Sequence, residues 1–230
     1  ALLCDEEVKI YNVPNISDTK DLEEILTFLN AKVDVGNDSI VINTKDIVNK
    51  SIPQELSSKL RASYYFMGVL LGKFKKVDIH FPGGCSIGKR PINLHLDGFK
   101  KLGANIIEED DHFIITADNL KGSHIYLDMP SVGATINLIF AAVKAKGKTV
   151  IDNAAKEPEI VNVATFLNNM GAKIRGAGTS EITIYGVNYL HKAVHEVIPD
   201  RIEAGTYTII ASLVGNNLKI NKLIPSHIES

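Results

Sequence analysis

Apolar residues along this chain follow two spacings that alternate and then repeat. Short runs with every second residue apolar, such as VKIYNV from Val8 to Val13, predict strands that bury one face. Longer stretches with apolar residues three or four positions apart predict amphipathic helices. Read in order, the predicted unit is a strand, a loop, a helix, a turn of small residues, two strands and a second helix.

Three copies of this unit are marked by similar segments. A first helix ends at LNAKV, LGANI or MGAKI, and a strand-like run follows it as DSIVIN, DHFIITA or SEITIYG. Second helices are predicted to begin near Arg61, Ser131 and Arg201, to end at Gly72, Gly147 and Gly215, and to lead into VDIHF, TVIDN and LKINK. A single helix end of this kind is common in α/β proteins. Three with matching flanks indicate internal duplication.

The predicted fold class is therefore α/β with three repeats, at about 1–62, 63–134 and 135–205. Neither helix of a unit can bury its apolar face alone, so we expect the units to pack together around shared helices.

Composition narrows the classes of function. The chain has 230 residues, 45% of them hydrophobic, and a net charge of −2 from 25 basic and 27 acidic side chains. A nucleic-acid-binding protein would show a surplus of basic residues, so this charge balance gives no support for nucleic-acid binding. Apolar runs of membrane length and a signal peptide are both missing from the sequence, so we predict a cytoplasmic protein without membrane contact. The opening ALLCDEE has no initiator Met and reads like a helix that has been cut.

Cysteine usage predicts thiol chemistry rather than disulfides or metal binding. Cys4 and Cys85 are the two cysteines, and they form no CxxC motif or Cys/His cluster, so we expect no zinc site and no cofactor. Cys85 follows a Pro-Gly-Gly turn and precedes two cations, Lys89 and Arg90. Nearby cations favour the reactive thiolate, although free cysteines are more often simply buried. The helix expected after Pro91 adds an anion-binding N-terminus.

Several blocks of the sequence resemble the enolpyruvyl transferase family, and within it the enzymes that act on UDP-N-acetylglucosamine. The blocks are RASYYFMGVLLGKF, FPGGCSIGKRPINLHLDGFKKLGA, PSVGATINLIFAA, IDNAAKEPEIVNVATFLNNMGAKI and IPDRIEAGTY. They occur in the family's order and cover nearly the whole chain. The resemblance implies one lobe of a two-lobed enzyme, built from three βαβαββ-type units with helices inside and sheets outside. The crossover to the missing second lobe would lie at about 199–230.

The resemblance also implies a reaction, the first committed step of peptidoglycan synthesis in the cell wall. The enolpyruvyl group of phosphoenolpyruvate moves to the 3′-hydroxyl of UDP-N-acetylglucosamine, and phosphate is released. Cys85 aligns with the family's proton donor, which forms a covalent adduct with phosphoenolpyruvate and is alkylated by fosfomycin. Arg61 and Arg90 align with substrate-contacting arginines, since a guanidinium can hold a phosphate or carboxylate with two hydrogen bonds. A surface ion pair is the ordinary alternative for either arginine.

Further substrate contacts are implied along two segments. The extended stretch Pro91, Ile92, Asn93 and Leu94 aligns with the part that contacts uridine, with Asn93 standing where the family commonly has Asp. Ser131, Val132 and Gly133 resemble the diphosphate-binding start of a helix, and Met129 and Pro130 complete that segment. On local grounds Ser131 is equally a helix N-cap. Asp200, Arg201 and Glu203 match a block at the crossover, where they could cap a helix or form ion pairs between lobes. His95 is taken as structural.

Competing hypotheses remain open at this point. The nearest is an enzyme that acts on shikimate 3-phosphate, whose family lacks the PGGC loop. A non-catalytic binding module, a thiol redox protein and an RNA-processing enzyme with similar repeats are more distant. The resemblance further implies that the isolated lobe is inactive or nearly so, because the family's Lys-Asn pair, its catalytic Asp and further arginines lie outside this sequence.

Overall fold

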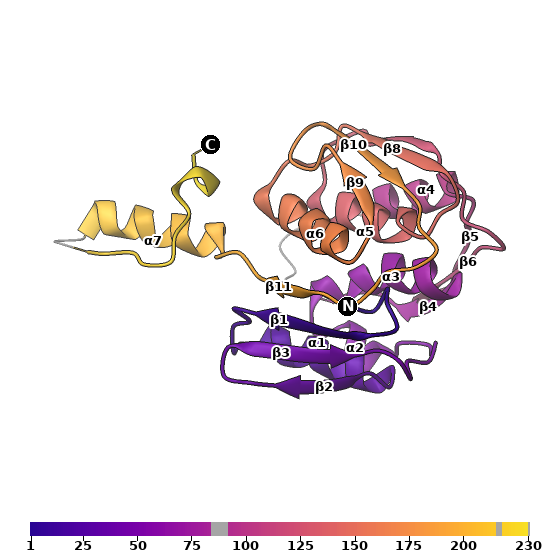
Figure 1. Cartoon of the computed structure of the whole chain (residues 1–230), viewed down its shortest axis with the longest axis horizontal. Coiled ribbons are helices and arrows are strands. Elements are labelled where there is room, and N and C mark those ends of the chain that lie inside the picture. The colour runs from indigo at the N-terminus through magenta and orange to yellow at the C-terminus, as the bar shows by residue number, and fades with distance from the viewer. Residues whose placement is uncertain (84–91, 215–217, 230) are drawn as a thin grey trace.

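A computed structural model describes residues 1–83, 92–214 and 218–229 of the chain (Figure 1). Its strands are β1 (Glu7–Tyr11), β2 (Lys32–Val35), β3 (Ser39–Asn43), β4 (Lys76–His80), β5 (Asn105–Glu108), β6 (His112–Thr116), β7 (His124–Tyr126), β8 (Lys148–Asp152), β9 (Lys173–Arg175), β10 (Glu181–Tyr185) and β11 (Val194–Glu196). Its helices are α1 (Ser17–Phe28), α2 (Gln54–Ser57), α3 (Tyr65–Phe74), α4 (Asn93–Lys101), α5 (Val132–Ala142), α6 (Pro158–Asn169) and α7 (Arg201–Val214), with 3-10 turns η1 (Arg61–Tyr64) and η2 (Pro225–His227).

The three sheets share one topology. Their strand orders are β11-β1-β3-β2, β4-β6-β5 and β7-β8-β10-β9. In each sheet the first strand of a unit pairs antiparallel with the third, and the third pairs antiparallel with the second. On its other side, the first strand of each unit pairs in parallel with a segment from another unit. β1 pairs with β11 and β8 pairs with β7, while β4 forms a single parallel bridge with Ile52. The units are thus joined in a ring, which confirms the predicted repeat.

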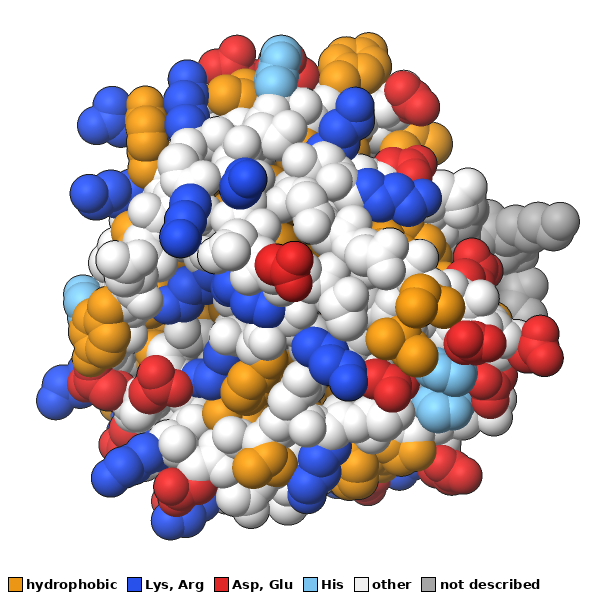
Figure 2. All heavy atoms as spheres, turned by 90° about the vertical axis from the view of Figure 1, so that its right-hand side faces the viewer, with side chains coloured by type: hydrophobic (Ala, Val, Ile, Leu, Met, Phe, Trp, Pro, Cys, Tyr) orange, Lys and Arg blue, Asp and Glu red, His pale blue; other side chains and the backbone are white. Residues whose placement is uncertain are grey.

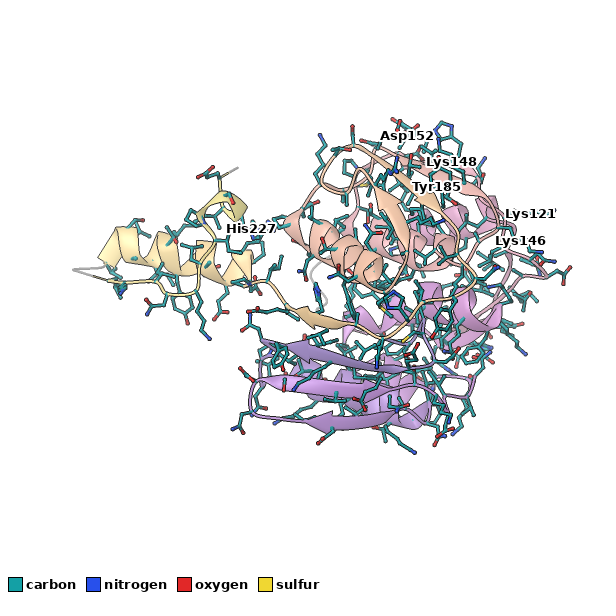
Figure 3. The ribbon with its side chains drawn as sticks, in the orientation of Figure 1. Lys121, Lys146, Lys148, Asp152, Tyr185 and His227 are labelled. Atoms are coloured by element: carbon teal, nitrogen blue, oxygen red, sulfur yellow. The ribbon has the colours of Figure 1, made fainter. Side chains whose placement is uncertain are left out.

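The helices lie inside and the sheets outside, as expected (Figure 1). Along β8 and β10 the buried residues Thr149, Ile151, Ile182 and Ile184 alternate with more exposed ones. Lys148, Asp152 and Tyr185 belong to the alternate set and reach the outer side of the sheet (Figure 3). This period-2 pattern buries one face of each sheet against the helices. None of the described helices is long and apolar enough to cross a membrane.

The centre of the molecule is the crossing of α3 and α5, where glycines allow close approach. A Cβ on Gly68 would lie 2.3 Å from the Asn137 carbonyl oxygen, and one on Gly72 would lie 2.9 Å from that of Phe140. The prediction that the helix ends at Gly72 is wrong by two residues. The helix continues to Phe74, and Lys75 closes it with a φ of 60°. Gly72 serves packing rather than termination.

The last helix, α7, departs from the body of the molecule (Figure 1). Ala204 is its one buried residue among those described, while apolar side chains such as Leu213 and Val214 are more than three-quarters exposed. The predicted strand LKINK, at 218–222, is not formed. The strands that follow α3 and α5 pair with a later strand of their own unit, and no such partner follows 218–222 in the described chain.

Candidate active site

The predicted substrate residues meet where several helices begin. Arg61 is the first residue of η1, which leads into α3, and its guanidinium carbon lies 5.6 Å from the centre of the Tyr64 ring. The Tyr64 ring packs on the His95 ring of α4 in a T-shaped arrangement, with the ring centres 4.9 Å apart. Gly133, in the first turn of α5, lies against both rings, because a Cβ there would be 2.5 Å from Tyr64 Oη and 3.1 Å from His95 Cε1. The structure therefore brings Arg61 close to the segment that begins at Ser131.

A buried amide fixes this arrangement. Asn137 Oδ1 accepts from the Gly68 backbone N–H at 2.8 Å, and Asn137 Nδ2 donates to the Tyr64 carbonyl at 3.0 Å and to His95 Nδ1 at 2.8 Å. Because Nδ1 of His95 accepts, the proton of the neutral imidazole is on Nε2. Burial, helped by the charge of Arg61, lowers the pKa of His95 to about 4. His95 is therefore neutral near pH 7 and acts as a packing and hydrogen-bonding residue, as predicted.

Ser131 caps the helix that carries the predicted diphosphate contacts. Its hydroxyl oxygen accepts from the Ala134 backbone N–H at 3.3 Å, which confirms the N-cap interpretation. The N–H groups of Val132 and Gly133 belong to the first turn of α5, so they have no carbonyl partner within the helix. They point out of the helix N-terminus, which carries a partial positive charge. Met129 and Pro130 are exposed just before this end. The buried Thr135 accepts from the Ala155 N–H at 3.1 Å, which ties the loop before α6 to the same region.

Cys85, Arg90 and Pro91 lie outside the described residues, within segment 84–91. The described residues that flank this segment are both anchored near the site. The Gly83 N–H donates to the Ser57 carbonyl at 3.1 Å, and that carbonyl also accepts from Ser63 of η1 at 2.7 Å. On the other side, the Ile92 carbonyl accepts from the His95 and Leu96 backbone N–H groups.

Asn93 and Leu94 correct one expectation. Both belong to the first turn of α4, with Ile92 as its N-cap, so these two residues are helical rather than extended. The helix expected after Pro91 is present, and Phe99 and Leu102 at its C-terminal end are fully buried. Since His95 of α4 touches Gly133 of α5, Asn93 and Leu94 still begin their helix close to the Ser131 end.

Charged residues around the start of α7 have defined structural partners. Asp200 Oδ1 accepts from the N–H groups of Ile202 and Glu203 at 2.7 and 3.1 Å, so it caps α7. Arg201 forms two hydrogen bonds of 3.1 Å to the carboxylate of Glu159 on α6. This pairing lowers the pKa of Glu159 against the opposing effect of burial.

The opposite ends of α3 and α5 carry lysines. A cavity of about 360 Å³ there is lined by Leu3, Asp5, Gly72, Lys73, Lys75, Asn119, Leu120, Lys144, Lys146, Val187 and Asn188. Lys73 pairs with Asp5 at 2.6 Å, and burial lowers the pKa of Lys75 and Lys144. Cations suit helix C-termini just as anions suit N-termini. Lys146 lies on the right of Figure 3, the side shown in Figure 2, where Lys and Arg are interspersed with Asp and Glu.

Two contributors to the site escaped the sequence prediction, Tyr64 and Asn137. The available signal for Asn137 was a single amide within the apolar run ATINLIFAA, since a buried polar side chain needs partners. Tyr64 has no comparable signal, because an aromatic at helical spacing is ordinarily a core residue.

Comparison with known proteins agrees with this architecture. The chain is 51% identical over 229 residues to UDP-N-acetylglucosamine 1-carboxyvinyltransferase 2 of Listeria monocytogenes and 52% identical over 230 residues to the protein of that name from Staphylococcus aureus. Each match covers all of this chain but only 54% and 55% of the relative, so the chain spans about half their length.

Solved structures share the fold at low sequence identity. The enolpyruvyl transferase NikO from Streptomyces tendae superposes with a TM-score of 0.78 at 22% identity, covering 90% of this chain and 50% of that one. EPSP synthase from Acinetobacter baumannii gives 0.68 at 18% identity, covering 90% and 48%. The family model for EPSP synthase (3-phosphoshikimate 1-carboxyvinyltransferase) matches residues 1–230, and the chain belongs to this family.

Proposed function

We propose that this chain is the loop-bearing lobe of a cytoplasmic enzyme that transfers the enolpyruvyl group of phosphoenolpyruvate to the 3′-hydroxyl of UDP-N-acetylglucosamine. The observation that carries the proposal is the meeting of Arg61 with the N-terminus of α5 through Tyr64, His95 and Gly133. Both substrates are anions, and a guanidinium beside a helix N-terminus is an anion site. The similarity to relatives named for this activity favours this acceptor over shikimate 3-phosphate.

In the proposed reaction, the Cys85 thiol gives its proton to the methylene carbon of phosphoenolpyruvate. Positive charge then develops on the neighbouring carbon, and the sugar oxygen bonds there while losing its proton to a base. Loss of a proton from the new methyl group restores the double bond as phosphate leaves. The base is expected in the second lobe. Arg61 and Arg90 hold the anionic donor, and positive groups so placed stabilise the charge that moves onto the departing phosphate.

The nucleotide sugar would lie across the ends of two helices. We assign the diphosphate to Ser131, Val132 and Gly133, with Met129 and Pro130 beside it, and the uridine to the stretch Pro91–Leu94. The first turns of α4 and α5 touch through His95 and Gly133, so one ligand could reach both. Because Ser131 already caps α5, phosphate recognition would use mainly backbone N–H groups.

We further propose that α7 begins the second lobe. It leaves the body of the molecule (Figure 1) and exposes apolar side chains that a folded protein would cover. The crossover would then follow β11, with Arg201 and Glu159 fixing the direction in which α7 departs.

The activity is tested on the protein extended to the full length of its relatives, by phosphate release from phosphoenolpyruvate. We expect turnover with UDP-N-acetylglucosamine and none with shikimate 3-phosphate. Cys85→Ser should abolish turnover, and mass spectrometry should locate a fosfomycin adduct on Cys85 of the unsubstituted protein. Turnover with shikimate 3-phosphate alone would reverse the assignment of the acceptor.

The role of Arg61 has a matched control in Arg175, an exposed arginine of β9. Loss of a charged hydrogen bond to a substrate costs about 1.5–3 kcal/mol, or roughly 10- to 100-fold in kcat/KM. We expect Arg61→Ala to show such a loss and Arg175→Ala to leave kcat/KM unchanged. Equal effects of the two substitutions would remove Arg61 from the site. The unextended chain should not turn over, because it lacks the second wall of the cleft.

A further inference from the structure

Two histidines and an aspartate converge at one end of the second sheet. His80 ends β4 and His112 begins β6, and the two are directly opposite in the antiparallel register. Asp111 immediately precedes His112. One ligand-type atom from each side chain lies within 4.8 Å of the other two, and no second trio of His, Cys, Asp or Glu does so in the described part of the chain.

The backbone fixes how His80 faces this cluster. Its Nδ1 lies 3.1 Å from the Ile52 carbonyl oxygen, which can only accept a hydrogen bond. Nδ1 therefore carries a proton, and in the neutral ring the lone pair is on Nε2. This nitrogen lies 3.5 Å from Asp111 Oδ2. A ligating histidine typically donates its other ring N–H to a carbonyl or carboxylate in this way, which sets the orientation of the ring.

The 3.5 Å separation of His80 Nε2 from Asp111 Oδ2 matches the ligand spacing of a metal centre. A lone pair on nitrogen and a carboxylate oxygen repel unless a proton or a metal ion lies between them. Zinc bonds to nitrogen and oxygen are about 2.0–2.2 Å long, which places two ligands of a tetrahedral site roughly 3.4 Å apart. His112 Nδ1 forms a hydrogen bond of 2.8 Å with Asp111 Oδ1, and a bound ion would replace this contact. The ring of His112 stacks on that of His80 with the centres 5.2 Å apart, so both imidazoles lie at the same place.

We propose that His80, Asp111 and His112 bind a divalent transition-metal ion, with Zn²⁺ the best fit. Two imidazoles and one carboxylate suit this ion, and water would complete the coordination. The side chain of Asp111 is 57% exposed and can rotate, while the histidines are about one-quarter exposed. The ion can thus enter from solvent. The three residues are far apart or merely adjacent in the sequence, so their spacing gave no sign of such a site.

The test is a titration of the chelator-treated chain with Zn²⁺ by calorimetry, repeated with Co²⁺ to read the ligands from its absorption spectrum. We expect saturable one-to-one binding without a thiolate charge-transfer band. Asp111→Asn and His112→Gln should each weaken binding at least about tenfold, since removing a ligand should cost at least as much as removing a supporting partner. His124→Gln is the matched control. His124 pairs with Asp152 on the third sheet but has no third ligand among the residues that the structure describes, so binding should be unchanged.

A second measurement needs no substitution. Zn²⁺ should protect His80 and His112, but not His124, from acylation by diethyl pyrocarbonate, as located by mass spectrometry. Three outcomes would each overturn the site. They are no saturable binding up to millimolar Zn²⁺, a thiolate band with Co²⁺, and acylation of His80 and His112 that is the same with and without Zn²⁺.

Discussion

At the scale of single residues, Asn137 connects the core to the candidate site. Its amide makes three hydrogen bonds, which join α3, α5, η1 and α4. Each partner is a buried or partly buried polar group, and such groups are costly when left unpaired. The same side chain orients His95 and supports Tyr64 beneath Arg61. Stability and substrate geometry therefore depend on one amide.

Replacement of this amide should destabilise the fold strongly. Asn137→Ala would leave three polar groups without their partner, at about 1–3 kcal/mol each, so we expect a loss of roughly 3 kcal/mol or more in the free energy of unfolding. Asn49→Ala is the control, because Asn49 makes one exposed hydrogen bond, to the Lys76 carbonyl, and should change stability by less than about 1 kcal/mol. Urea denaturation measures both. Similar values would show that the Asn137 network contributes little.

His95 should make the fold sensitive to acid. Its pKa is near 4 when folded and about 6.5 when unfolded, so the unfolded chain binds more protons between these values. The contribution of His95 to the free energy of unfolding should therefore be fully present above pH 6.5. It should be lost as the pH is lowered toward 4, by about 3 kcal/mol in total. The raised pKa of His112 acts in the opposite direction, so the comparison is between the chain and His95→Gln. Identical pH dependence of the two by urea denaturation would contradict the shift.

At the scale of elements, the sequence predicts the long strands and helices but not the short closing strands. β1, β3, β4, β6, β8 and β10 each have five residues, and in all of these except β1 buried positions alternate with less buried ones, so a single buried face is recognisable. β7 and β11 have three residues each, too few for a period to be read. Their pairing depends on a neighbouring unit. LKINK has the pattern of a strand but has no described partner to pair with.

The candidate site was likewise predictable from the sequence only where its features are local. The N-cap at Ser131 is a local signal, and the sequence identifies it. The contacts of Gly133 with Tyr64 and His95 depend on how η1, α4 and α5 meet, which local spacing does not encode. Family resemblance supplied Arg61 as a candidate, while the residues that hold it in place came only from the structure.

The two central helices should tolerate no side chain at their closest approach. A Cβ at Gly68 would meet the backbone of Asn137 at 2.3 Å, and a backbone atom cannot move aside cheaply. We expect Gly68→Ala to lower the free energy of unfolding by at least about 1–3 kcal/mol. Gly205, also inside a helix, has nothing within 4 Å, so Gly205→Ala should be neutral or stabilising by up to about 1 kcal/mol. Thermal melts of both variants measure these changes in stability. Equal destabilisation by the two substitutions would mean that the contact between α3 and α5 is not the reason for the loss.

At the scale of the whole molecule, the ring of three units is closed by β11. This strand, at the end of the third unit, pairs in parallel with β1 of the first. The Lys9 N–H also donates to the Ala193 carbonyl at 3.2 Å, and the Val197 N–H donates to that of Tyr11 at 3.0 Å. The chain before α7 thus completes the first sheet. The folded unit visible in the structure ends with this closure rather than with the last helix.

Shortening the chain at two points separates these contributions. Removal of residues 199–230 takes away α7, which buries only Ala204 of its described residues and is held to the body by Arg201 and Glu159. Such an ion pair contributes at most about 1 kcal/mol when partly exposed, so the melting temperature should change little. Solubility should rise, since the exposed apolar face of α7 is gone.

Removal of residues 191–230 also takes β11 and leaves β1 as an unpaired edge, so the melting temperature should fall and unfolding should become less cooperative. Circular dichroism melts and sedimentation measure both. If the first truncation destabilises as much as the second, α7 is part of this lobe, and the proposed crossover is in the wrong place.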